Sequence, residues 1–181
     1  LWISVASAQN LSISSDSFVC VKDLISFRAI SNQTIVSESW SFGDGFTSNQ
    51  QNPSHIYNNI GLKTVTVEAV FSGGSTKSVS RQIMVHDLPQ PQFELNDSLL
   101  CFGNHNLCIE DNSTMGLTTS GYASRLILWG DGARSDAQNP INEKEVCYSS
   151  YPKPDDKPYT INIEISNDKG CEARWSANVF V

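Results

Sequence analysis

The sequence predicts an all-β protein that contains two similar antiparallel sandwiches in tandem. Short alternating runs of apolar and polar residues, separated by Gly, Asn, Asp, Ser and Pro, fill the chain, and helical periodicity is almost absent. A Gly-Asp-Gly triplet begins at Gly43 and again at Gly130, and each is followed by Ser and then by Gln-Asn-Pro at a constant offset of 87 residues. Seven matched positions at one offset indicate an internal duplication.

The remaining segments of the two halves align in the same order. DSFVC, which ends at Cys20, matches DSLLC, which ends at Cys101, at an offset of 81 residues, and residues 63–85 match residues 159–181 at an offset of 96. Each rise in the offset marks an insertion in the second half. We therefore expect loops at Thr114–Leu126 and Ser149–Pro158.

The proline-containing stretch HDLPQPQF separates the two halves and is typical of a short, stiff linker. We expect a first domain at residues 10–86, a linker at 87–91 and a second, diverged domain at 92–181. Residues 1–9 begin with an apolar run, LWISVA, which is expected to form an extended strand of a neighbouring domain or one donated to another molecule. The remnant of a secretory signal is the alternative interpretation.

Composition excludes several classes of partner. Hydrophobic residues make up 39% of the chain and charged residues 17%, which is typical of a folded protein. The net charge is −7, and no cluster of Lys and Arg is present, so we expect neither nucleic acid nor an anionic membrane surface as a partner. No apolar run reaches the roughly 18 residues that a membrane-spanning helix needs, so membrane insertion is not expected.

The motifs WSFGDG, SNQQNPSHIY and GLKTVTV together resemble the PKD (polycystic kidney disease) domain, an Ig-like sandwich of seven strands. The resemblance covers nearly all of residues 10–86. The second half resembles a diverged copy, in which Ile127 replaces the motif's Trp, Trp129 replaces its Phe, and residues 146–148 replace its His-x-Tyr. In such a tandem, the first insertion is expected at the junction between the copies.

The resemblance implies a non-catalytic, extracellular or cell-surface module. The leading hypothesis is a spacer and adhesive unit of a larger surface or filament-forming protein, whose partners are its other domains or other subunits of an assembly. A carbohydrate- or matrix-binding accessory domain of a secreted hydrolase is the alternative. No Gly-x-Ser-x-Gly, His-Glu-x-x-His or phosphate-binding glycine loop occurs in the sequence, so enzymatic activity is not expected.

The five cysteines are too widely spaced for a zinc ribbon or a redox pair, and they favour an oxidising compartment. The alignment and the expected strand faces favour disulfides between Cys101 and Cys171 and between Cys108 and Cys147, although four cysteines allow two other pairings. Cys20 is then left over. We interpret it as a buried free thiol, with an intermolecular disulfide as the alternative.

The two Gly-Asp-Gly triplets are candidate tight turns, in which the Asp carboxylate accepts hydrogen bonds from backbone N–H groups. Calcium binding by these aspartates is the less favoured alternative, because no dense run of acidic residues surrounds them, and no other cofactor is expected. The turn residues are Gly43, Asp44, Gly45, Gly130, Asp131 and Gly132.

A binding surface needs exposed side chains. Trp40, Trp129 and Trp175 all fall at inward-facing positions of predicted strands, so they are assigned to the core. The remaining candidates for contact with a polysaccharide, matrix or protein partner are Trp2, Tyr122, Tyr151, Asp155 and Asp156.

Overall fold

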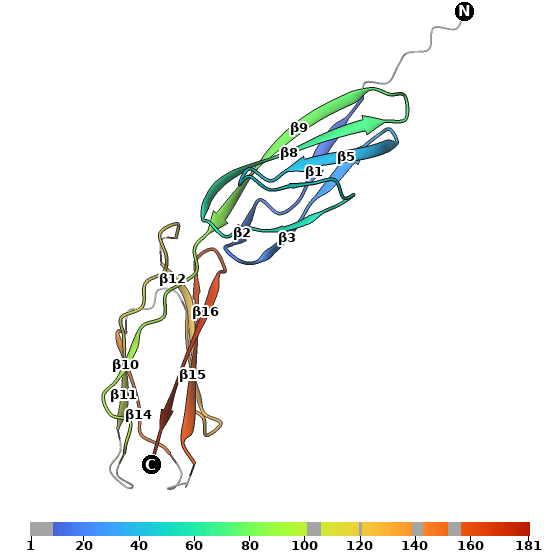
Figure 1. The fold of residues 1–181 in the computed structure, drawn as a ribbon. Coiled ribbons are helices and arrows are strands. Elements are labelled where there is room, and N and C mark those ends of the chain that lie inside the picture. Colours follow the sequence, from blue (N-terminus) through green and yellow to red (C-terminus); the bar gives the residue numbers. More distant parts are fainter. Residues whose placement is uncertain (1–8, 101–105, 120, 139–142, 152–156) are drawn as a thin grey trace, which may run out of the picture. The chain divides into compact units, whose positions relative to one another are not determined.

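The computed structural model describes residues 9–100, 106–119, 121–138, 143–151 and 157–181. The chain divides into two compact units: unit 1 ends at His86 and unit 2 begins at Asp87. All regular elements of the described residues are β-strands (Figure 1), and none of these residues forms a helix long and apolar enough to cross a membrane. The predicted fold, two Ig-like sandwiches in one chain, is confirmed.

The larger sheet of unit 1 has five strands in the order β2-β9-β8-β5-β6. β2 runs parallel to β9, and the other neighbours are antiparallel. Strict alternation in the longest strands places one set of side chains inward, because successive residues of a strand face opposite sides of the sheet. The strands are β2 (Phe18–Cys20), β5 (Ile35–Ser41), β6 (Thr47–Ser48), β8 (Gly61–Phe71) and β9 (Thr76–His86).

Two short strand pairs form the opposite layer of unit 1. β1 (Leu11–Ser14) pairs with β4 (Arg28–Ser31), and β3 (Leu24–Ser26) pairs with β7 (Ser54–Ile56), in both cases antiparallel. The side chains between the layers are almost completely buried, and each contributes roughly 1.5 to 3 kcal/mol to stability. They include Ile25, Phe27, Trp40, Phe42, Tyr57, Val65, Val67, Phe71, Ile83 and Val85.

Unit 2 contains a four-stranded sheet, β13-β12-β15-β16, and a three-stranded sheet, β10-β11-β14. Its core is made mainly of Leu107, Ile109, Ile127, Trp129, Tyr151, Ile161, Ile163, Ile165 and Val179. The strands are β10 (Phe93–Leu95), β11 (Leu107–Asp111), β12 (Tyr122–Leu128), β13 (Arg134–Gln138), β14 (Glu145–Tyr148), β15 (Tyr159–Asn167) and β16 (Glu172–Val179).

The duplication is visible in individual backbone hydrogen bonds. In unit 1 the Met84 N–H donates to the Ser17 carbonyl over 3.1 Å, and in unit 2 the Phe180 N–H donates to the Ser98 carbonyl over 2.9 Å. These four positions are related by the offsets of 81 and 96 residues found in the sequence. The segments that follow Ser17 and Ser98 therefore run parallel to the C-terminal part of their own unit in the same way.

Residues 87–91, the predicted short, stiff linker, are bonded to the body of unit 2. Gln90 exchanges two backbone hydrogen bonds with Thr114, of 2.7 and 3.1 Å. The Asp87 N–H donates to Thr118 Oγ1, and the fully buried Asn167 side chain donates to the Asp87 carbonyl. The insertion that begins at Thr114 thus holds the first residues of unit 2 in place.

Position 43 leaves no room for a side chain, so it requires glycine. Its φ is +79°, and a Cβ at this position would lie 2.6 Å from the Thr64 carbonyl oxygen. Gly130 repeats this arrangement in unit 2, with φ +90° and a distance of 2.7 Å to the Thr160 oxygen. Each triplet therefore begins where the chain passes directly against the backbone of a neighbouring strand.

We predict that Gly43→Ala destabilises unit 1 by about 3 kcal/mol or more, because it adds a steric clash with backbone to an unfavourable φ. Gly45→Ala is the matched control: Gly45 also has a positive φ, +96°, but a Cβ there would have no atom within 4 Å. It should cost only about 1 kcal/mol. Urea unfolding followed by circular dichroism measures both, and equal losses would contradict the role assigned to the close approach.

Candidate functional site

The Asp44 carboxylate connects the first Gly-Asp-Gly turn to the core of unit 1. Its Oδ1 accepts a hydrogen bond from the Phe46 N–H over 3.2 Å, and its Oδ2 lies 2.7 Å from His55 Nε2. The His55 ring stacks on Phe42, with centroids 4.2 Å apart and an interplanar angle of 3°. One oxygen therefore caps the turn, while the other fixes an imidazole against the aromatic core.

The Asp131 carboxylate does the same in unit 2 with a different partner. Its Oδ1 accepts from the Ala133 N–H over 2.9 Å, and its Oδ2 accepts from the Tyr148 hydroxyl. The Tyr148 ring stacks on Trp129, with centroids 4.8 Å apart. The predicted turn-capping role of both aspartates is confirmed, and each carboxylate oxygen has a hydrogen-bond partner in the protein.

The expected match between residues 146–148 and His-x-Tyr is wrong, by two residues at the His position and by three at the Tyr position. Tyr148 takes the place of His55, and Tyr151 takes the place of Tyr57: the Tyr57 hydroxyl donates to the Phe42 carbonyl over 2.9 Å, and the Tyr151 hydroxyl donates to the Trp129 carbonyl over 3.2 Å. Unit 2 has one more residue between the two rings than unit 1 has. An alignment without gaps at this point cannot show that displacement.

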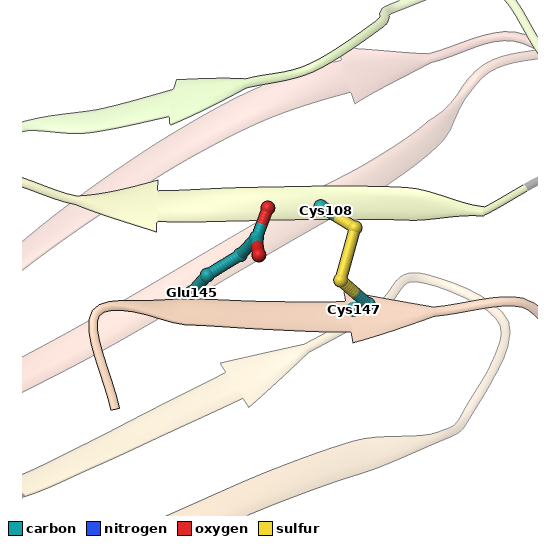
Figure 2. A group of neighbouring side chains, drawn as sticks. All are labelled: Cys108, Glu145 and Cys147. Carbon is teal, nitrogen blue, oxygen red and sulfur yellow. A yellow bond between two sulfur atoms is a disulfide. The ribbon is translucent and has the colours of Figure 1, made fainter. Parts of the chain in front are cut away.

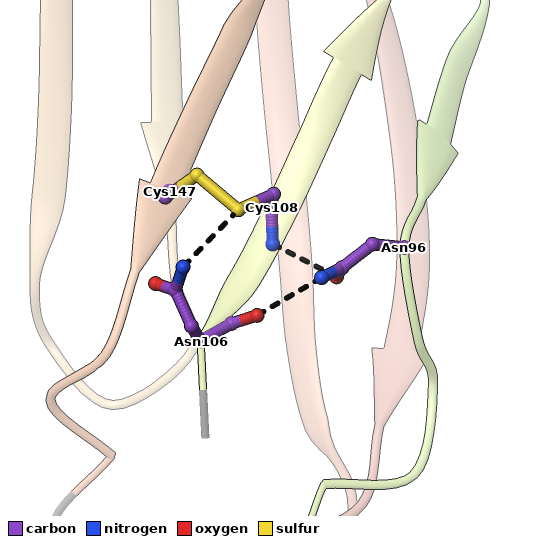
Figure 3. The surroundings of a disulfide bond; sticks show 4 residues. All are labelled: Asn96, Asn106, Cys108 and Cys147. Atoms are coloured by element: carbon purple, nitrogen blue, oxygen red, sulfur yellow. Dashed lines mark hydrogen bonds between the residues drawn. A yellow bond between two sulfur atoms is a disulfide. The ribbon is translucent and has the colours of Figure 1, made fainter. Parts of the chain in front are cut away.

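The predicted disulfide between Cys108 and Cys147 is confirmed (Figures 2 and 3). The two residues lie directly opposite each other in β11 and β14, and their Cα atoms are 4.0 Å apart. Asn96 binds β11 on the edge opposite β14. Its side chain accepts a hydrogen bond from the Cys108 N–H and donates one to the Asn106 carbonyl. The bridge and this amide together fasten the three-stranded sheet.

Among the described residues, Cys108, Glu145 and Cys147 are the one group of three potential metal ligands that lie close together, within 4.8 Å (Figure 2). Metal binding by cysteine requires the thiolate. Because the two sulfur atoms are bonded to each other, the group is not a metal site in this oxidation state.

The expectation for Cys20 is wrong, because this residue belongs to a disulfide and is not a free thiol. The sequence argument failed because the alignment assigned the four cysteines of the second half to each other, and spacing alone does not determine connectivity. Cys171 is buried, and its N–H donates to Asn167 Oδ1 over 3.0 Å. The predicted pairing of Cys101 with Cys171 is wrong as well, because, with Cys108 joined to Cys147, it would leave the disulfide-bonded Cys20 without a partner among the five cysteines.

Two of the proposed contact residues are not available for a partner. Tyr151 is only 3% exposed and lies in the core of unit 2. Tyr122 packs against the same core, and its hydroxyl donates to the Asp111 carboxylate at 2.7 and 2.8 Å; burial raises its pKa. Both predictions are wrong because inserted segments return these rings to the sandwich. Trp2, Asp155 and Asp156 lie outside the described residues.

Sequence reasoning missed two buried charges. Glu38 is 7% exposed and accepts a hydrogen bond from the Trp40 indole N–H over 2.9 Å. Arg125, at the corresponding position 87 residues later, is 3% exposed and forms a 2.9 Å ion pair with Asp111. The sequence did contain a signal for Glu38. Residues two apart in a strand face the same side of the sheet, so Glu38 must face inward if Trp40 does.

Comparison with known proteins identifies unit 1. A family model described as the PKD domain matches residues 8–85. On this match, unit 1 is named the PKD domain. The chain is also 36% identical over 59 residues to collagenase ColA of Bacillus cereus, a match that takes in 33% of this chain and 6% of the collagenase. This chain therefore spans only a small part of the collagenase.

Solved structures also resemble the chain. The fibronectin(III)-like modules of Clostridium thermocellum CbhA are 16% identical, with 94% of each chain covered and a TM-score of 0.47. The PKD1 domain of Vibrio anguillarum Epp is 24% identical and covers 44% of this chain and 94% of its own, with a TM-score of 0.38.

We predict that replacing both Cys108 and Cys147 by Ser lowers the unfolding free energy of unit 2 by about 2 to 4 kcal/mol, because the bridge closes a loop over a sequence separation of 39 residues. The PKD domain is the internal control and should keep its stability. Urea titration followed by two-dimensional NMR reports each unit through its own amides. Equal losses in the two units would contradict a local effect of this bridge.

The Tyr148 hydroxyl predicts a pH dependence. Burial, together with the Asp131 carboxylate, raises the pKa of Tyr148 to about 12, whereas an unfolded tyrosine ionises near pH ~10. Between these values the unfolded state binds fewer protons than the folded state, so the unfolding free energy of unit 2 falls as the pH rises. Tyr148→Phe should make this decline shallower. Urea unfolding at a series of alkaline pH values tests it, and an unchanged slope would contradict the assignment.

Proposed function

We propose that this chain is a segment of an extracellular protein in which the PKD domain and the second sandwich act as a non-catalytic spacer and adhesive module. The proposal rests on one observation: the Asp, His and Tyr side chains at the two Gly-Asp-Gly turns, which could take part in catalysis elsewhere, are hydrogen-bonded to each other and hold the structure together. The Asp44 carboxylate and the His55 imidazole are bonded to each other, and the Asp131 carboxylate is bonded to the Tyr148 phenol. Each pair lies against aromatic rings, where it orders a turn.

The cysteines support an extracellular location. Cys108 and Cys147 form a disulfide, and Cys20 is also disulfide-bonded. Disulfides persist in oxidising environments such as the outside of the cell. The similarity of this chain to part of a bacterial collagenase supports the same location. The partners proposed for the module are other domains of the parent protein or other subunits of an assembly.

A second candidate is an accessory domain that binds polysaccharide or extracellular matrix. Such binding uses exposed aromatic rings as flat contact surfaces. Among the exposed large hydrophobic residues that the structure describes, Phe46 has the most exposed aromatic ring, at 61% against 46% for Phe18 and Phe180. It lies directly after the first Gly-Asp-Gly turn, and its centroid is 5.8 Å from that of His55. Phe46 was not among the residues predicted from the sequence.

Retention on insoluble material distinguishes the two candidates. The intact chain is mixed with cellulose, chitin and collagen fibrils, sedimented and quantified. The spacer proposal predicts no retention on any of them. Retention that Phe46→Ala abolishes would support the accessory-domain candidate. Leu117→Ala is the matched control, because Leu117 is 88% exposed and lies in unit 2.

A further inference from the structure

Strand β5 of the PKD domain has one open edge. Along one side it pairs with β8 from Ile35 to Ser41, whereas on the other side β6 pairs only with Trp40 and Ser41. Among the described residues, no strand pairs with that second side from Ile35 to Ser39. An open edge presents backbone N–H and C=O groups that can pair with an added strand.

The second unit does not have this open edge. There β13 pairs with β12 at five positions, from Ser124 to Leu128. With the offset of 87 residues, these positions correspond to residues 37–41 of the PKD domain. The same strand of the sandwich is therefore covered in one copy and uncovered in the other.

A groove of about 280 Å³ lies beside the open edge. The Glu38 carboxylate lines it, with Oε2 bonded to the Trp40 indole and no bond from a described residue to the other oxygen. Val36 is 67% exposed next to it. The lining residues are Ile35, Val36, Ser37, Glu38, Asn49 and Gln51.

The charge of Glu38 bears on which kind of strand could pair with this edge. An inward-pointing charge and a β-bulge, which lies here between Ile35 and Ser37, both discourage the pairing of apolar strands. An apolar strand would cover the carboxylate without giving it a partner, which is unfavourable. A strand that brings a Lys or Arg to this position would pair with the charge instead, while its aliphatic residues cover Ile35 and Val36.

We propose that the PKD domain binds an extended, basic peptide segment of another protein, which adds a strand to the open edge of β5 and places a Lys or Arg against Glu38. The proposal rests on the adhesive role given above and specifies its partner class. The two proposals are tested by different measurements. If the edge binds no peptide, the chain could still show no retention on polysaccharide or collagen, and the spacer proposal would stand.

The test is NMR titration of the intact, 15N-labelled chain with a capped peptide, Thr-Val-Lys-Val-Thr-Val. We expect shifts of the amides of residues 36–39 and of the Trp40 indole N–H. The Trp129 indole N–H, which is bonded to Ser135 in unit 2, is the internal control and should not move. The acidic peptide Thr-Val-Glu-Val-Thr-Val should bind at least tenfold more weakly.

Variants of Glu38 and Val36 distinguish an effect of charge on peptide binding from an effect on folding. Glu38→Gln retains an acceptor for Trp40 and should weaken binding of the lysine peptide by about tenfold to a hundredfold. At the exposed position 36, Val36→Lys should weaken binding and Val36→Glu should strengthen it, with little effect on folding. The proposal is overturned if the lysine peptide leaves β5 unshifted, if both peptides bind alike, or if the same amides shift with protein concentration alone, which would assign the edge to a second copy.

Discussion

Both units depend on one hydrogen-bonding arrangement, an aspartate that follows a core strand and uses its two oxygens for different purposes. One oxygen caps the turn through a backbone N–H, and the other holds a ring that stacks on the strand's own aromatic residue. The flanking glycines Gly43 and Gly130 are required because the turn passes directly against a neighbouring strand. The turn, the hydrophobic core and the second layer are thus fixed together at one carboxylate.

The arrangement is retained although its chemistry differs between the units. His55 supplies the ring in unit 1, and Tyr148 supplies it in unit 2. What both rings share is a polar atom that reaches the carboxylate and a flat face that packs on Phe42 or Trp129. Geometry is preserved here more strictly than residue type, which is consistent with a structural role for both aspartates.

Much of the fold could be predicted from the sequence, because alternation and a repeated motif are local signals. The all-β class, the inward columns around Trp40 and Trp129, the break at His86 and the Cys108–Cys147 bridge all followed from spacing and facing. What the sequence did not reveal depends on contacts between distant segments. The residues 87–91 are held by Asn167 and Thr114, and Tyr151 is drawn into the core after an insertion, and neither contact leaves a periodic signal.

The Cys108–Cys147 bridge has a mechanical consequence. When a surface protein is pulled from its two ends, force passes along the covalent chain, and a disulfide shortens that path. Between these cysteines the sequence separation is 39 residues, a stretch that includes the second Gly-Asp-Gly turn. At about 3.4 Å per extended residue, roughly 130 Å of chain is withheld from stretching while the sulfur atoms remain joined. Reduction of the bridge would add this length to the part of the chain that can be extended.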